Sequence, residues 1–173
     1  PGILYYMPQI WTSDNTDAVE RLKIQYGTSL AYPLSCMSAH VSTCPNHQVG
    51  RTTPLATRFH AALTGSFGYE LDLCSMSPEE KEAVKAQIEE YHGYQGLLSN
   101  GRFYRLLEPA SNAHCAWMTV SEGREEALVC YFKILSDNKR LPLSLRLRGL
   151  DPERRYRDSR TGEIYSGVTL MNA

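Results

Sequence analysis

The fold is decided by the stretch Pro8-Gln9-Ile10-Trp11-Thr12-Ser13-Asp14-Asn15-Thr16-Asp17, which continues directly into Ala18-Val19-Glu20-Arg21-Leu22. Ile10 and Trp11 predict the end of a short buried strand, and the spacing Asp17-x-x-Glu20 predicts a capping box that opens a helix. Asp14 lies between these two elements. Side chains at a strand-to-helix junction project into the crevice beyond the strand carboxyl ends, where α/β enzymes carry their catalytic groups.

The two aspartates of this junction have different local surroundings. Asp17 has a structural task, because its carboxylate can accept hydrogen bonds from backbone N–H groups of the first turn and its charge suits the positive helix end. Asp14 has no comparable task, since an aspartate after a strand end is neither a cap nor a typical core residue. The local pattern leaves two roles open for Asp14, a functional carboxylate or an Asx-turn residue at the start of the loop.

Short apolar strands alternate with amphipathic helices over the first part of the chain. The expected elements are a strand ending at Trp11, a helix from Ala18 to Gly27, a strand over residues 34–41, a helix opened by Thr53-Pro54, a strand over residues 66–73 and a helix opened by Ser77-Pro78-Glu79-Glu80. The apolar faces expected on the helices are Val19, Leu22 and Tyr26, then Leu55, Phe59, Ala62 and Leu63, then Val84, Ile88 and Tyr91. This order of elements predicts βα units and a parallel sheet.

Past Leu98 the sequence changes to alternating segments separated by turn residues. Strands are predicted over residues 102–107, 115–120, 128–135, 143–147 and 164–170, with turns at Asn100-Gly101, Glu122-Gly123, Asp137-Asn138, Asp151-Pro152 and Thr161-Gly162. Strands of this length and spacing are typical of an antiparallel β domain. We therefore expect two domains, residues 1–98 and residues 99–173, with Trp117 in the core of the second.

Composition excludes several classes of function. The chain has 173 residues, of which 42% are hydrophobic and 21% charged, and a net charge of −1, so nothing favours a nucleic-acid or membrane-surface partner. No apolar stretch approaches the roughly 18 residues of a membrane span. The five cysteines form no C-x-x-C pair and no zinc spacing. They predict buried free thiols in a reducing compartment, which favours a cytoplasmic protein, and we expect neither a metal nor a cofactor.

The opening stretch, together with Glu20-Arg-Leu-Lys-Ile-Gln-Tyr-Gly-Thr-Ser29, resembles the retaining α-galactosidases of glycoside hydrolase family 36. The likeness continues through Ser38-Ala39-His40-Val41-Ser42, Pro45-Asn46-His47-Gln48, Gly50-Arg51, Thr57-Arg58-Phe59-His60 and Gly68-Tyr69-Glu70-Leu71-Asp72. The resemblance implies an α/β plus all-β fold: the C-terminal third of a (β/α)8 TIM barrel followed by a small antiparallel β-sandwich domain. It implies that Asp14 is the general acid/base at the end of the sixth barrel strand, and that the parent enzyme is a homo-oligomer acting on α-galactosides such as raffinose or melibiose.

Five further residues are candidates for binding the sugar. Trp11 could stack its indole on the apolar face of a pyranose, or could simply pack in the barrel. The other four are His40, Asn46, His47 and Arg51, which follow or end a predicted strand. A loop so rich in polar residues could equally serve to satisfy its own backbone.

One departure from the family pattern concerns the nucleophile. The family carries it on the fourth strand in a Lys-x-Asp word, and no Lys-x-Asp occurs in this sequence. The resemblance thus implies that this chain carries the acid/base half of a catalytic pair. Two alternatives stay open at this point: a related α-glycoside hydrolase or transglycosylase, and a non-catalytic carbohydrate-binding β module.

Overall fold

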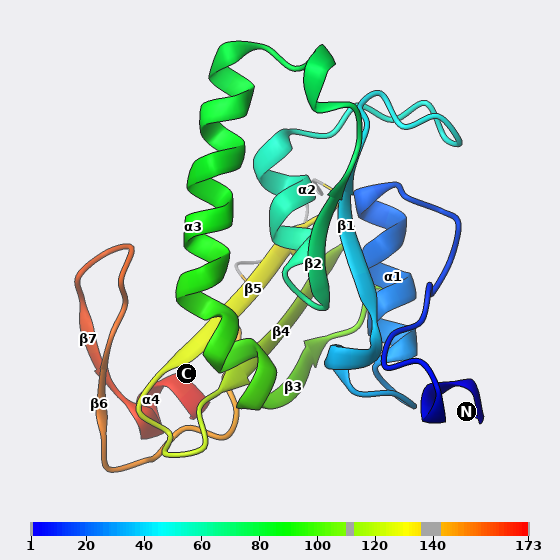
Figure 1. Ribbon diagram of the computed structural model, residues 1–173. Helices are drawn as coiled ribbons and strands as arrows, with labels where there is room; N and C mark the ends of the chain where they lie inside the picture. The colour runs from blue at the N-terminus through cyan, green and yellow to red at the C-terminus, as the bar shows by residue number, and fades with distance from the viewer. Residues whose placement is uncertain (1, 110–112, 136–142, 173) are drawn as a thin grey trace. The chain divides into compact units, whose positions relative to one another are not determined.

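The computed structural model describes residues 2–109, 113–135 and 143–172, and the chain forms two compact units, residues 1–99 and residues 100–173 (Figure 1). The first unit contains, in order, the 3-10 helix η1 (Gly2–Tyr5), α1 (Ala18–Thr28), the 3-10 helix η2 (Leu34–Cys36), β1 (Ser38–Ser42), α2 (Leu55–Ala62), β2 (Ser66–Glu70), the 3-10 helix η3 (Leu73–Ser75) and α3 (Pro78–Asn100). The second contains β3 (Arg102–Leu107), β4 (His114–Val120), β5 (Ala127–Lys133), β6 (Arg155–Arg157), β7 (Ile164–Ser166) and α4 (Gly167–Asn172).

Parallel strand pairing organises the first unit. β1 and β2 pair in parallel, with a register that runs from Ser38 opposite Ser66 to Ser42 opposite Glu70. Ile10 forms an isolated parallel bridge with Met37, just before β1, so the chain entering the Asp14 junction lies beside β1 in the same direction. The predicted βα order and the parallel sheet are therefore confirmed in this unit.

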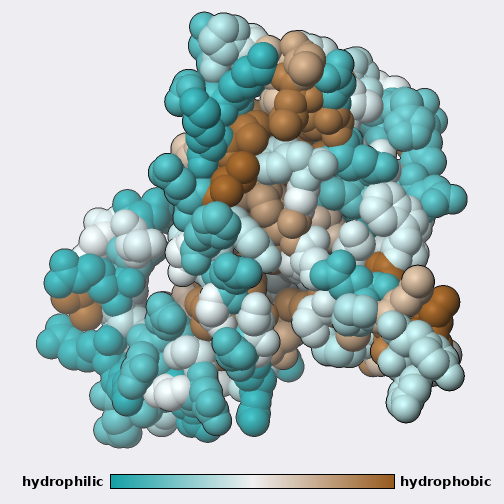
Figure 2. Space-filling model, viewed as in Figure 1, coloured by the Kyte–Doolittle hydropathy of each residue, from teal (hydrophilic) through white to brown (hydrophobic). Residues whose placement is uncertain are grey.

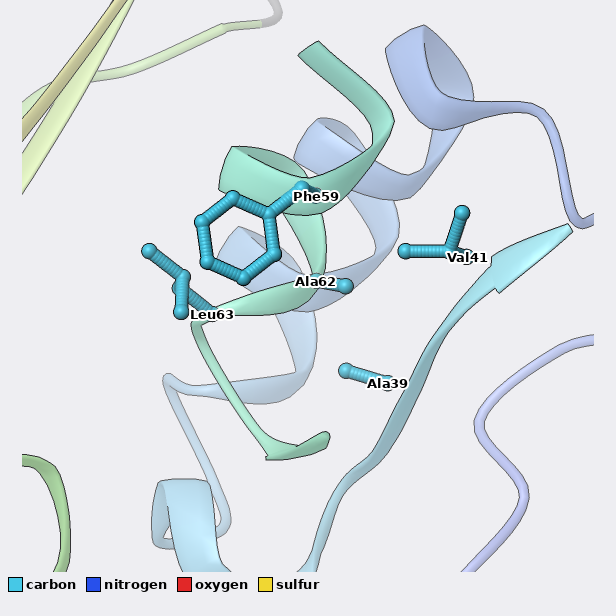
Figure 3. Packing of buried hydrophobic residues seen from close by; sticks show 5 residues of the cluster. All are labelled: Ala39, Val41, Phe59, Ala62 and Leu63. Carbon is cyan, nitrogen blue, oxygen red and sulfur yellow. The ribbon is translucent and has the colours of Figure 1, made fainter. Parts of the chain in front are cut away.

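The core of the first unit lies between β1 and α2. Ala39 and Val41 of β1 pack against Phe59 and Ala62 of α2 and against Leu63, which caps the end of α2, and all five are at most 2% exposed (Figure 3). Because side chains alternate along a strand, residues 38, 40 and 42 point to the other face of β1. The face that carries His40 is thus polar, while the helix-facing side is apolar.

Two of the three predicted helix faces need correction. The buried face of α1 is Ala18, Arg21, Leu22 and Gln25, so two polar residues replace the expected Val19 and Tyr26. On α3, Ile88 is 36% exposed. Apolar surface gathers beside the N-terminal part of this helix in the space-filling view (Figure 2). The α2 face agrees with the prediction.

The second unit is built on a three-stranded antiparallel sheet in the order β3-β4-β5, with β6 and β7 forming a separate antiparallel pair. Met118 and Val120 of the central strand pack with Leu150 in the core of this unit. Trp117 is 2% exposed, which confirms its predicted place in the core.

Several predicted boundaries were wrong for identifiable reasons. The strand expected at Ile10-Trp11 is a single bridge, and Trp11 is 49% exposed. The strand over 34–41 starts only at Ser38, because residues 34–36 form a 3-10 turn after Pro33, and the strand from Ser66 ends at Glu70. Residues 143–147 form no strand, and the segment 164–170 turns into α4 at Gly167. The turn at Asp137-Asn138 lies outside the described residues.

The cysteines also differ from expectation. All five are free thiols, but only Cys115 is buried and Cys74 is exposed. Burial raises the pKa of Cys115 to about 12, so this thiol is unreactive near neutral pH. Within the described ranges, no helix has both the length and the apolarity that crossing a bilayer requires.

Candidate active site

Asp14 is the exposed member of an otherwise anchored segment. Across the part of the chain that the structure describes, its carboxylate takes part in no hydrogen bond or ion pair. The residues around it are held in place. The Asn15 backbone N–H donates to Ser13 Oγ at 3.1 Å, and the Asp17 backbone N–H donates to Asn15 Oδ1 at 3.0 Å. The structure therefore fixes the backbone on both sides of Asp14 and leaves its carboxylate available.

The buried Arg21 side chain links this segment to β1 through hydrogen bonds. Its guanidinium donates to the Ser13 carbonyl at 3.3 Å and to the Ser38 carbonyl at 2.8 Å, although the side chain is only 2% exposed. The same guanidinium donates through Nε to Gln25, which in turn donates to the Ala61 carbonyl at 2.7 Å. Burial lowers the pKa of Arg21, and the charge of Glu70 opposes that shift.

Sequence reasoning missed both Arg21 and Gln25. They stand one helical turn apart and flank Leu22 on the same face, and this spacing was the available signal for a polar buried stripe.

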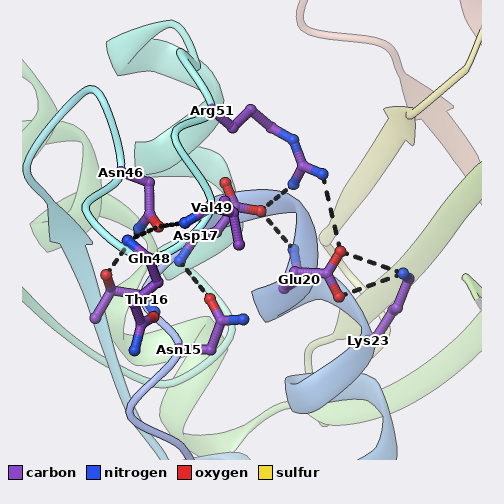
Figure 4. A network of polar contacts seen from close by, with 9 residues as sticks. All are labelled: Asn15, Thr16, Asp17, Glu20, Lys23, Asn46, Gln48, Val49 and Arg51. Atoms are coloured by element: carbon purple, nitrogen blue, oxygen red, sulfur yellow. Dashed lines mark hydrogen bonds and ion pairs between the residues drawn. The ribbon is translucent and has the colours of Figure 1, made fainter.

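Asp17 caps α1 as predicted. Its side chain accepts from the Glu20 backbone N–H at 3.0 Å and from the Arg51 guanidinium, and the residue is 1% exposed (Figure 4). The second half of the predicted capping box does not form, because Glu20 turns instead to Lys23 at 3.3 Å and to Arg51 at 3.9 Å. The Asp17 backbone N–H, which Glu20 was expected to bind, donates instead to Asn15 Oδ1 at 3.0 Å.

The loop that follows β1, residues 43–51, packs against residues 13–17, which we call the Asp14 segment. We call residues 43–51 the clasp loop. Asn46 is 5% exposed and its Oδ1 accepts from the backbone N–H groups of Gln48 and Val49, both at 3.0 Å. Its Nδ2 donates to Thr16 Oγ1 at 2.9 Å, and Gln48 Oε1 accepts from the Thr16 backbone N–H at 3.2 Å (Figure 4).

A cavity of about 10 Å³ remains between these two loops, with Asp17, Asn46 and Arg51 among its lining residues. This is room for about one water molecule and far too little for a sugar. Asp17 Oδ1 has no hydrogen-bond partner among the described residues, so a bound water would suit this cavity.

Trp11 and His40 form a stacked pair. Their ring centroids are 4.4 Å apart and the ring planes differ by 7°. The His40 side chain is 5% exposed, whereas Trp11 is 49% exposed, so the imidazole covers one part of the indole and leaves another part open.

The charge state of His40 follows from its surroundings. Its Nε2 lies 3.0 Å from Glu70 Oε2, but the two atoms are not aligned for a hydrogen bond and neither ring nitrogen has a partner among the described residues. Burial lowers the pKa of His40 below its ordinary value of 6.5, and the positive charge of Arg21 lowers it further. The negative charge of Glu70 raises the pKa, but this effect is smaller. His40 is therefore a neutral, buried support for Trp11 at neutral pH.

The predicted site residues thus separate into three groups. Trp11 and His40 contact each other, Asn46 and Arg51 contact the segment around Asp14, and His47 is exposed on the clasp loop. Among the described residues, no group of histidines, cysteines and carboxylates is arranged to hold a metal ion.

Comparison with known proteins identifies the family. Residues 1–101, more than half of the chain, match the family model described as Melibiase, and residues 114–173 match the Glycosyl hydrolase family 36 C-terminal domain. The chain is 55% identical to the α-galactosidase AgaA of Geobacillus stearothermophilus over 100% of its own length and 24% of that protein.

Solved structures agree. Crystal structures of two variants of the family 36 α-galactosidase AgaA from Geobacillus stearothermophilus, one in complex with raffinose and one with stachyose, match with TM-scores of 0.95. They are 52% and 54% identical over 99% and 100% of this chain, and each match covers 24% of the solved chain. The chain thus spans about a quarter of the length of the relatives it matches. The Melibiase model covers the first part, the family 36 model covers the second, and family 36 α-galactosidases match nearly the whole length, so the chain belongs to glycoside hydrolase family 36.

Proposed function

We propose that this chain supplies the general acid/base of a retaining α-galactosidase that removes terminal α-galactosyl residues from oligosaccharides such as raffinose. The observation that carries the proposal is Asp14, an exposed carboxylate without a protein partner on a backbone that is anchored on both sides. Membership of family 36 and the complexes of related enzymes with raffinose and stachyose support the substrate class.

The fold that we propose is the last third of a (β/α)8 barrel, formed by residues 1–98, followed by an antiparallel β-sandwich domain. The parallel order of the Ile10 segment, β1 and β2, with helices between them, supports the barrel. The sheet β3-β4-β5 and the pair β6-β7 supply strands for the sandwich. In a barrel, Asp14 and the clasp loop would both follow strand ends, on the catalytic face.

The chemistry needs two carboxylates about 5 to 5.5 Å apart, one attacking the anomeric carbon and one protonating the departing glycosidic oxygen. Asp14 takes the second role and later deprotonates the incoming water. Since the chain contains no Lys-x-Asp word, the nucleophile comes from another part of the full-length protein.

The remaining candidates are assigned by their surroundings. Trp11 offers the open part of its indole to a sugar ring, with His40 stacked beside it. His47, exposed on the clasp loop, is proposed to reach the substrate directly. Asn46 and Arg51 belong to the site as well, but the contacts that they make are to Thr16 and Asp17.

Asp14→Asn in the full-length enzyme tests the proposal. Aryl α-galactosides with good leaving groups should be slowed mainly in deglycosylation, because they scarcely need the proton while water still needs a base. Unactivated galactosides should lose on the order of 10²–10⁴-fold, as is usual for an abolished general acid. Added azide, which needs no base, should restore turnover of the aryl substrate and yield α-galactosyl azide, since both steps invert.

Glu82→Gln is the control, because Glu82 is an exposed carboxylate within α3, away from the strand ends that carry the proposed site. It should leave turnover unchanged. Full activity in the Asp14 variant, or no response to azide, would refute the assignment.

Assembly of the full-length protein as a homo-oligomer and its cytoplasmic location stay predictions, to be measured by light scattering and cell fractionation.

A further inference from the structure

We propose that the clasp loop acts as a positioning device for the acid/base, with Arg51 and Asn46 as positioning residues that act on Asp14 through Asp17 and Thr16. The inference rests on the proposed function of Asp14. It differs from a sugar-binding role for the same two residues, because it places their effect on proton transfer rather than on substrate affinity.

The contacts converge on the backbone just after Asp14. Asn46 donates to Thr16 Oγ1 at 2.9 Å and Gln48 accepts from the Thr16 backbone N–H at 3.2 Å, while Arg51 binds the Asp17 carboxylate (Figure 4). Thr16 and Asp17 are 8% and 1% exposed, so both receiving residues are buried, whereas the Arg51 side chain is 39% exposed and reaches Asp17 from the surface. No comparable contact is made by Asp14 itself within the described chain.

The clasp loop is firm enough to serve as an anchor. Arg58 donates to the Ser42 carbonyl at 2.6 Å and to the Thr53 carbonyl at 3.1 Å, which fixes the backbone at both ends of the loop. Inside the loop, the Gly50 N–H donates to the Asn46 carbonyl at 2.8 Å, and Gly50 has a φ of 68°, which favours glycine.

Charge explains why Arg51 is needed. The Asp17 carboxylate is almost completely buried, and a buried carboxylate requires a compensating partner. Arg51 supplies it from outside the helix, at a point three residues beyond Asp14. Without the guanidinium, the helix start would be drawn toward solvent, and the Asp14 segment would move with it. A displacement of about 1 Å at a catalytic group can cost on the order of 100-fold in rate.

The test is the leaving-group dependence of the full-length enzyme. Arg51→Gln and Asn46→Ala should each lower kcat/KM by about 10- to 100-fold for galactosides with poor leaving groups, and by less than about 3-fold for aryl galactosides with good ones. Galactose, used as a competitive inhibitor, should bind with unchanged affinity. Arg51→Lys, which keeps the charge, should recover part of the loss.

Two other outcomes would overturn the inference. An equal loss for every leaving group, together with a lower unfolding temperature, would mean a purely structural role. A weaker affinity for galactose, with the leaving-group dependence unchanged, would mean that Arg51 contacts the sugar. Lys23→Gln is the control, because it removes a charge from the same cluster without touching Asp17, and it should change none of these quantities.

A double variant separates this inference from the proposed function. In an Asp14→Asn background, Arg51→Gln should add no further sensitivity to the leaving group, since the group that it positions is gone. If Asp14→Asn itself shows no such sensitivity, the proposed function fails. If Asp14→Asn shows it and Arg51→Gln does not, only the positioning role fails.

Discussion

Asp17 and Asp14 lie three residues apart on the same junction, yet they differ in burial and in partners. Asp17→Asn should destabilise the protein by about 1–3 kcal/mol, because asparagine can still cap α1 but loses the charge-assisted bond to Arg51. Urea unfolding of the full-length enzyme measures the cost, with Asp72→Asn as the reference. A cost below about 0.5 kcal/mol would show that the pair with Arg51 adds no stability.

His40 gives the fold a pH-dependent stability. Because burial and Arg21 lower its pKa below 6.5, the unfolded chain binds a proton more readily than the folded one. The stability associated with neutral His40 is complete above pH 6.5 and is lost as the pH falls through this value toward the lowered pKa. His40→Gln should therefore flatten the dependence of the unfolding free energy on pH just below 6.5.

The check is urea unfolding at a series of pH values, with His60→Gln as the control because His60 is exposed on α2. Equal slopes for the wild-type protein and the His40 variant would contradict a neutral buried imidazole. An unchanged slope in the His60 variant is expected.

At the residue scale, local contacts were predictable and distant ones were not. The cap from Asp17 to the Glu20 backbone spans three residues and follows from the sequence pattern. The ion pair from Arg51 spans 34 residues and depends on how β1 brings its following loop back to α1, which no local pattern encodes. Glu20 does not make its predicted capping contact, because the Asp17 N–H donates to Asn15 and the Glu20 carboxylate lies beside Lys23 and Arg51.

Replacing two glycines of the first unit by alanine should have opposite effects on stability, because one is limited by packing and the other by helix propensity. A Cβ at Gly65 would lie 2.5 Å from the Met37 carbonyl oxygen and 2.9 Å from Ala39 Cβ, so Gly65→Ala should cost about 1–3 kcal/mol by forcing the start of β2 away from β1. Gly27, inside α1, has open space within 4 Å of such a Cβ. Gly27→Ala should stabilise by about 0.5–1 kcal/mol, because alanine favours the helix.

Thermal unfolding of both variants measures these opposite effects. A neutral Gly65 variant would mean that the β1–β2 junction yields easily to an added methyl group. The end of α1 also differs from the sequence prediction. Gly27 was expected to end this helix, but α1 continues to Thr28 and Ser29 is its C-cap.

Of the two predicted capping boxes, the one at α1 forms only its Asp17 half, and the one at α3 forms completely. The box at the start of α3 forms in both directions, with the Ser77 N–H donating to Glu80 at 2.9 Å and the Glu80 N–H to Ser77 Oγ at 3.2 Å. The strand predicted over residues 164–170 was wrong beyond Ser166. Alternating apolar residues do not show that Gly167 packs against the Asp151 carbonyl and starts a helix.

For the whole molecule, family membership was recognisable from the sequence because a long ordered series of residues carried it, whereas the arrangement of the site required the structure. Composition and periodicity alone predicted βα units followed by antiparallel strands. They could not show that Arg21 and Gln25 are buried or that Trp11 stacks on His40, since both facts depend on tertiary packing.

The isolated 173-residue chain should be inactive, because it contains only one of the two catalytic carboxylates. Retaining hydrolysis needs a nucleophile as well as an acid/base, and the sequence has Asp14 but no Lys-x-Asp word. The purified chain should therefore release nitrophenol from aryl α-galactosides no faster than buffer does, while the full-length enzyme at equal concentration should turn over. A burst of nitrophenol from the chain alone would mean that a second carboxylate within it can attack the anomeric carbon. Glu70 would then be the first residue to substitute, because it ends β2 beside the strand that leads to the clasp loop and is largely exposed.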